Sequence, residues 1–133
     1  MKQYLLDTNI CAFLFRGKFG IEQKIREIGL RNCHLSIVTY AELYYGCKNS
    51  DDFDYNFQIL NEFCDNVDVI GIDEVIPTYA SEKSRLRKQG QLIEDFDILI
   101  GATALDYDMT LVTENVKHMS RIKGISIENW VER

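Results

Sequence analysis

The sequence predicts an α/β fold in which helices cover both faces of a parallel sheet. Short apolar runs rich in β-branched residues alternate with longer stretches of helical periodicity along the whole chain. The 133 residues contain no Pro-, Gly- or Ser-rich linker, no low-complexity segment and no repeat. With 46% hydrophobic residues the chain can bury a core of its own, so we expect one domain spanning residues 1–133.

Two strands and four helices are expected in the first half of the chain. The strands are apolar runs over Tyr4–Leu6 and Cys33–Val38. The helices have apolar residues three and four positions apart, and they are expected over Asn9–Phe15, Ile21–Leu30, Thr39–Cys47 and Phe53–Phe63.

Three strands and two helices are expected in the second half. The strands are Val67–Ile72, Thr110–Thr113 and Ile125–Ile127. One helix is capped by Asp73 and runs to about Gln89, with Pro77 in its first turn, where a missing N–H is tolerated. The other helix covers Asp95–Tyr107. Strands separated by helices imply right-handed crossovers, and such sheets place their sites outside the carboxyl ends of the strands.

Charge and cysteine usage narrow the class of protein. A net charge of −6 argues against broad, non-specific binding of nucleic acid, which depends on a basic surface. The four cysteines lack metal-site spacing, so free thiols in a reducing, cytoplasmic compartment are expected. No signal peptide or membrane span is expected either.

Acidic residues stand beside the apolar core at several points. Asp7 ends the first strand, Glu42 lies in the helix after the second, and Asp95 and Asp97 directly precede an apolar helical segment. Because the carboxyl ends of parallel strands share one edge, Asp7 and Glu42 should meet there.

Each acid also has a purely structural interpretation. Asp7, Thr8 and Asn9 can all cap the following helix, an interpretation that suffices for Thr8 or Asn9 but is less satisfying for Asp7, which lies deepest against the strand. Thr39 to Glu42 fits a capping box, which for Glu42 alone is at least as good an explanation as catalysis. Acids are favoured in a first helical turn, and we assign Asp95 to the cap and Asp97 to the site.

Converging carboxylates need a compensating charge. Two of them about 5 Å apart repel by roughly 3 kcal/mol at an effective dielectric near 20. Oxygen-only ligands favour Mg²⁺ or Mn²⁺, and such an ion can activate water for attack on a phosphodiester. Thr113 and Asn115 could orient a water or a phosphate, although a turn and cap explains them equally well. The phosphate-loop, dinucleotide-binding and nucleophile-elbow motifs are all missing from the sequence.

The chain resembles the PIN-domain ribonucleases, specifically the VapC-type toxins of type II toxin–antitoxin pairs. The resemblance runs nearly end to end and rests on the order and spacing of five segments: residues 5–9 (LLDTN), 36–43 (SIVTYAEL), 90–102 (GQLIEDFDILIGA), 111–115 (LVTEN) and 127–130 (IENW).

The resemblance implies a three-layer α/β/α sandwich and endonucleolytic cleavage of RNA. It also implies that Asp7, Glu42 and Asp97 hold Mg²⁺ or Mn²⁺, and that Thr8 and Thr113 help to orient the site. A homodimer is implied, as is a cognate antitoxin whose C-terminal segment occludes the site. Asn115 stands where a fourth acid is common, and Gly101 replaces the usual Ala, a change expected to matter little.

The RNA target, of the tRNA or ribosomal RNA class, is left open by the sequence. Local cations such as Arg85, Arg87 and Lys88 could hold the RNA, although a solvated helix face is the simpler explanation of that run. Two alternatives to the toxin are an RNA-processing nuclease of the same fold without an antitoxin, and a catalytically silent interaction module.

Overall fold

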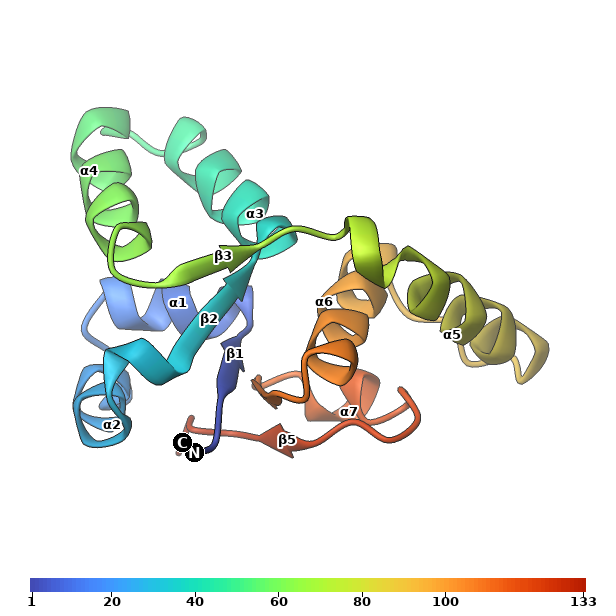
Figure 1. The fold of residues 1–133 in the computed structure, drawn as a ribbon. Coiled ribbons are helices and arrows are strands. Elements are labelled where there is room, and N and C mark those ends of the chain that lie inside the picture. The colour runs from blue at the N-terminus through green and yellow to red at the C-terminus, as the bar shows by residue number, and fades with distance from the viewer.

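A five-stranded, fully parallel sheet forms the centre of the protein, whose computed structural model describes all of residues 1–133. The strand order is β3-β2-β1-β4-β5, and every neighbouring pair is parallel. The strands are β1 (Tyr4–Leu6), β2 (Cys33–Ser36), β3 (Asp68–Ile70), β4 (Thr110–Val112) and β5 (Ile127–Glu128). The predicted parallel sheet is therefore confirmed, with β1 at its centre (Figure 1).

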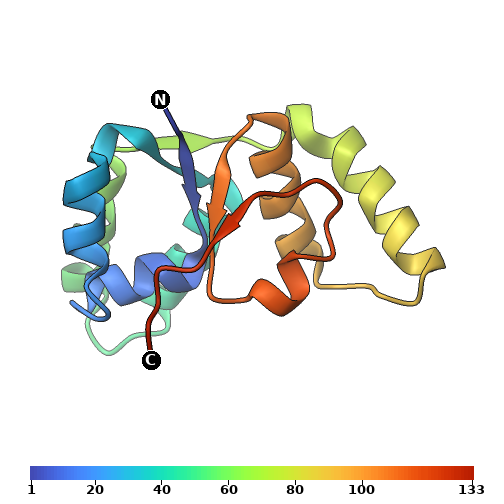
Figure 2. The ribbon, with the colours of Figure 1, turned by 90° about the horizontal axis from the view of Figure 1, so that it is seen from below.

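Helices lie on both sides of this sheet, so the predicted three-layer arrangement is confirmed (Figures 1 and 2). On one side are α1 (Thr8–Phe15), α2 (Ile21–Ile28), α3 (Ile37–Lys48) and α4 (Phe53–Cys64). On the other are α5 (Ile76–Lys88), α6 (Asp95–Asp106) and the short α7 (Val116–Met119). Single 3₁₀ turns over Leu30–Asn32 and Asp73–Val75 precede β2 and α5.

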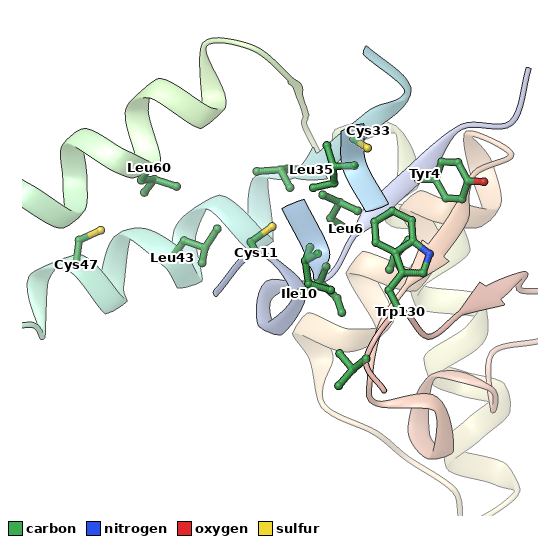
Figure 3. Close-up of a cluster of buried hydrophobic side chains, with 14 residues drawn as sticks. Tyr4, Leu6, Ile10, Cys11, Cys33, Leu35, Leu43, Cys47, Leu60 and Trp130 are labelled. Atoms are coloured by element: carbon green, nitrogen blue, oxygen red, sulfur yellow. The ribbon is translucent and has the colours of Figure 1, made fainter. Parts of the chain in front are cut away.

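The alternation of side chains along the central strand divides the core into two clusters. Leu6 packs with α1 to α4, whereas Leu5 packs with α6 and α7, and both residues are fully buried. Figure 3 shows the larger cluster, in which Trp130 near the C-terminus lies against Tyr4 with ring centroids 5.5 Å apart. The two layers of helices are thus held to the sheet by apolar burial on both faces.

All four cysteines are free thiols, and three of them are buried. Burial raises the pKa of Cys33 to about 11 and also raises that of Cys11, which keeps both thiols protonated at neutral pH. No helix is both long enough and apolar enough to cross a membrane.

The predicted boundaries before α3 and before α5 were wrong, for two different reasons. The strand expected over Cys33–Val38 ends at Ser36, whose hydroxyl accepts the N–H of Val38 and caps α3. Asp73 does not cap α5: it opens a 3₁₀ turn, and α5 follows at Ile76 with Pro77 in its first turn as predicted.

Gly101 allows α6 to pack closely against the segment that follows α7. A Cβ added at Gly101 would overlap Cδ1 of Ile122 and would lie 3.5 Å from Cγ1 of the same side chain. Ile122 is 1% exposed and has little room to move. We expected the presence of Gly instead of Ala at position 101 to have little effect. That expectation holds only if the side chain of Ile122 can move away from an added Cβ.

We predict that Gly101→Ala destabilises the protein by about 1–2 kcal/mol, because overpacking outweighs the gain in helix propensity. In an Ile122→Val background, which lacks Cδ1, the same substitution should be neutral or stabilising. Urea unfolding of the two single variants and the double variant measures this coupling. Additive effects would contradict the contact.

Candidate active site

One open cavity of about 760 Å³ lies where the carboxyl ends of β1 and β4 meet the first turns of α1 and α6. Six of its ten lining residues are acidic, one is hydrophobic, and none is Lys or Arg. The lining consists of Asp7, Thr8, Asn9, Glu42, Glu94, Asp95, Phe96, Asp97, Glu114 and Asn115. The fold thus collects all three predicted acids in one place.

Asp7 is the most buried acid of the cavity, with 6% of its surface exposed. Its Oδ1 accepts the N–H of Thr8 at 2.8 Å, and its Oδ2 accepts the hydroxyl of Thr113 at 2.7 Å. Burial raises the pKa of Asp7, while these two hydrogen bonds act in the opposite direction. Asp7 is also the N-cap of α1, so the capping interpretation that suited Asp7 less well than Thr8 or Asn9 does apply to Asp7.

Glu42 faces α1 and does not cap its own helix. Because Ser36 is the N-cap of α3, Glu42 lies in the second turn, and the capping-box interpretation is wrong. The hydroxyl of Thr8 donates to Oε1 of Glu42 at 2.6 Å and lies 3.4 Å from the hydroxyl of Thr39. Thr8, the first residue of α1, therefore links that helix to the middle of α3.

Asp97 completes the acidic group from the first turn of α6. The amide of Asn115 donates to its Oδ2 at 3.4 Å, and Nδ1 of His118 lies 2.9 Å from Oδ1 of the same Asn. Burial, together with the negative charges of Asp7, Glu42 and Glu94, raises the pKa of Asp97 to about 6. The charge at this point of the cavity is not compensated by the protein.

Asp95 behaves differently from Asp97, although it is only two residues away. Lys83 contacts its Oδ1 at 2.7 Å and the hydroxyl of Tyr79 donates to it at 2.9 Å, so its pKa is lowered. Asp95 therefore joins α6 to α5. The expectation that it caps α6 was wrong, since the N-cap position belongs to Glu94.

Three cavity residues were not singled out from the sequence. Glu114 is paired with Arg133, whereas Glu94 has no basic partner and adds to the charge around Asp97. Phe96 supplies the only apolar surface. The one signal that could have identified Glu94 and Phe96 is their position in the acidic run directly before α6.

The cations considered for RNA binding lie outside this cavity, toward the end of α5. Arg85 forms a salt bridge with Glu82 at 2.8 Å and donates a hydrogen bond to the carbonyl of Arg121 at 2.7 Å. Neither Arg87 nor Lys88 forms an ion pair. The contribution of all three to RNA binding stays a prediction.

The donor set of the cavity suits a hard divalent cation. Every polar side chain on the lining presents oxygen ligands, and no lining Lys or Arg neutralises them. No three acidic, His or Cys side chains are arranged as a ready-made metal-binding group. Mg²⁺ usually keeps several waters beside one or two carboxylates, so a tight protein cage is not required.

Comparisons with known proteins agree with this geometry. A family model described as PIN domain matches residues 4–125. The chain is 31% identical to ribonuclease VapC2 of Haemophilus influenzae over 98% of its length and 100% of that protein. It is 28% identical to the tRNA(fMet)-specific endonuclease VapC of Shigella flexneri, covering 98% of this chain and 99% of that protein.

Solved structures with the same fold include two toxin–antitoxin complexes. DNA-bound VapBC from Salmonella typhimurium matches with a TM-score of 0.89 and 26% identity, covering 98% of this chain and 99% of that one. VapBC2 from Rickettsia felis, bound to a promoter DNA fragment, matches with a TM-score of 0.88 and 28% identity, covering 96% and 98%.

We predict that Asp97→Asn stabilises the cation-free protein at about pH 8. The pKa of Asp97 is higher in the folded than in the unfolded state, so its ionisation costs stability as pH rises from about 4 through about 6. The gain should shrink as the pH falls below about 4 and should approach zero near pH 3, where the carboxyl is largely protonated in both states. Urea unfolding in EDTA at both pH values measures it.

Asp95→Asn is the matched control on the same helical turn. Because Lys83 and Tyr79 lower the pKa of Asp95, its loss should destabilise the protein at neutral pH, and the effect should vanish in acid. If Asp97→Asn destabilised the protein at pH 8 as Asp95→Asn does, the uncompensated charge at Asp97 would be disproved.

Proposed function

Because the chain belongs to the PIN-domain family and, within it, to the VapC-type ribonucleases, we propose that it is a divalent-metal-dependent endoribonuclease, the toxin of a toxin–antitoxin pair. In this proposal residues 1–133 form a single PIN domain. The observation that carries the proposal is the meeting of Asp7, Glu42 and Asp97, from three separate elements, in one cavity without a lining Lys or Arg.

Dependence on a divalent metal is general among PIN-domain ribonucleases. We assign Asp7, Glu42 and Asp97 as the residues that would hold Mg²⁺ or Mn²⁺. When bound, the cation would supply an activated water and would neutralise charge on the phosphoryl oxygens of the RNA. The pKa of Asp97 is raised first by burial and then by repulsion from Asp7, Glu42 and Glu94, and a bound cation would relieve that repulsion, which supports this assignment.

The supporting residues keep these carboxylates oriented without cancelling their charge. Thr113 donates to Asp7 and favours its ionised form, and Thr8 donates to Glu42. The amide of Asn115 donates to Asp97 and restrains the third carboxylate. Each of these donors is neutral, so the cavity keeps its negative potential for a cation.

We propose a VapB-type antitoxin as the protein partner, and a homodimer as the assembled toxin. Two structural relatives that match almost the whole chain are VapBC complexes, which supports the first part. An acidic cavity suits a basic C-terminal segment that places an Arg among the carboxylates, where charge-assisted hydrogen bonds are strong.

The RNA substrate, of the tRNA or ribosomal RNA class, would contact cations outside the acidic cavity. Of the three predicted, Arg85 is held by Glu82 and by the backbone of Arg121. Arg87 and Lys88 are exposed and unpaired at the end of α5, so they are the better candidates for phosphate contacts.

We predict that Asp7→Asn lowers Mg²⁺-dependent cleavage of bulk bacterial tRNA and ribosomal RNA by more than about a hundredfold, beyond the usual cost of losing a residue that only orients a metal ligand. EDTA should abolish the wild-type activity, and added Mg²⁺ should restore it. The readout is denaturing gel electrophoresis of the RNA.

Asp54→Asn, an exposed acid in the first turn of α4, is the control and should keep full activity. Circular dichroism would show that both variants remain folded. Wild-type protein that cuts no RNA with Mg²⁺ or Mn²⁺ would favour the silent interaction module.

We predict that Arg87→Glu combined with Lys88→Glu weakens RNA binding and lowers the salt slope of the association constant by about one per lost phosphate contact. Fluorescence anisotropy in an Asp7→Asn background measures binding without cleavage. Lys18→Glu with Arg31→Glu, which makes the same change in net charge at exposed positions elsewhere, should leave the slope unchanged. If the two double variants had equal salt slopes, α5 would not belong to the RNA-binding site.

A further inference from the structure

Phe96 is the only apolar residue on the lining of the acidic cavity. It lies in the first turn of α6 between Asp95 and Asp97, and half of its surface is exposed (50%). The residues that follow it in α6 are largely buried, including Ile98 and Ile100 at 0% exposure. An aromatic ring at this position contributes little to the core and is accessible to whatever occupies the cavity.

The charge of the cavity limits how RNA can be held there. RNA is a polyanion, and the lining has no Lys or Arg and six carboxylates, of which only Asp95 and Glu114 are paired with a cation. A divalent cation offsets only part of this negative potential, and the whole chain carries a net charge of −6. Affinity close to the reacting phosphate must therefore come from contacts that do not depend on charge. Stacking of a base on an aromatic ring is such a contact.

A second cavity adjoins the first on its acidic side. It has a volume of about 370 Å³ and shares Glu94, Asp95 and Asp97 with the first, and its lining adds Lys83 and His118. Phe96 lines only the first cavity, and Lys83 and His118 line only the second. An RNA strand that reached from one cavity to the other could therefore contact an aromatic ring in the first and basic side chains in the second.

We propose that Phe96 is the stacking platform for an unpaired nucleobase next to the scissile phosphate. The inference rests on the proposed ribonuclease function and names the part of the substrate that this site recognises. Adjacent Cα atoms are 3.8 Å apart, so the ring is anchored directly beside Asp97. A base within a duplex is covered on both faces, and only an unstacked base can use the ring.

The test compares five proteins on one RNA. The cleavage site of the wild type is first mapped in bulk bacterial tRNA and ribosomal RNA, and a short RNA containing that site then becomes the probe. Phe96→Trp keeps a flat aromatic face, Phe96→Leu keeps apolar bulk, and Phe96→Ala removes both. Tyr107→Ala, an exposed aromatic just past the other end of α6, is the control.

Under single-turnover conditions we expect kcat/KM to fall about ten- to a hundredfold for Phe96→Ala, and nearly as far for Phe96→Leu. Phe96→Trp and Tyr107→Ala should stay close to the wild type. The Mg²⁺-induced rise in Tm should be equal in all five proteins, which separates stacking from disturbance of Asp97.

A second measurement identifies the base. The probe RNA is made with an abasic residue on either side of the scissile bond. One of these should slow the wild type about as much as Phe96→Ala does, and Phe96→Ala should show no further loss on it. An equal abasic penalty in both proteins, or unchanged kcat/KM in Phe96→Ala, would overturn the inference.

Other outcomes point elsewhere. If Phe96→Ala cleaved normally but altered the oligomeric state or escaped inhibition by the antitoxin, the ring would belong to a protein interface and the stacking role would be rejected. If the wild type cut no RNA, the ribonuclease proposal itself would fail, a result distinct from normal cleavage by Phe96→Ala.

Discussion

The parallel sheet forces negative charge to accumulate at one edge. Asp7 follows β1, and the helices that carry Glu42 and Asp97 approach the same edge, so three carboxylates share one cavity. The protein places no Lys or Arg among them, and burial together with the neighbouring carboxylates raises the pKa of Asp97 to about 6. In the absence of a cation, the fold therefore carries an electrostatic cost at its candidate site, offset by apolar burial on both faces of the sheet.

Five of the six acids of the cavity are stabilised, in two different ways. Asp95 pairs with Lys83 and Glu114 pairs with Arg133, so their charges are cancelled. Neutral donors from Thr113, Thr8 and Asn115 instead hold Asp7, Glu42 and Asp97. A hydroxyl or an amide fixes a carboxylate in position yet leaves its charge available. The arrangement thus combines neutralised acids with others that keep their charge and attract cations.

The sequence predicted the elements that depend on hydrophobic pattern and missed those that depend on local hydrogen bonds. Alternating strands and helices were sufficient to predict a parallel sheet, and hence the meeting of Asp7 with Glu42. The β-branched pair Ile37-Val38 continues the pattern of β2, but the hydroxyl of Ser36 caps α3 and overrides that pattern. No feature of the sequence could show that Asp95 faces Lys83, because that pairing depends on how α5 packs against α6.

In the proposed function, the negative potential of the acidic cavity acts on three species: a divalent cation, an Arg of the antitoxin and the RNA. A divalent cation is attracted first, because it matches both the charge and the oxygen donors of the cavity. An Arg of a basic antitoxin segment would bind the same carboxylates as the cation. It would therefore compete with the cation more directly than with the RNA, which does not bind carboxylates. RNA is repelled until the cation is bound, and its remaining affinity must come from neutral contacts. The exposed ring of Phe96, at the centre of this acidic surface, is the group best suited to supply them.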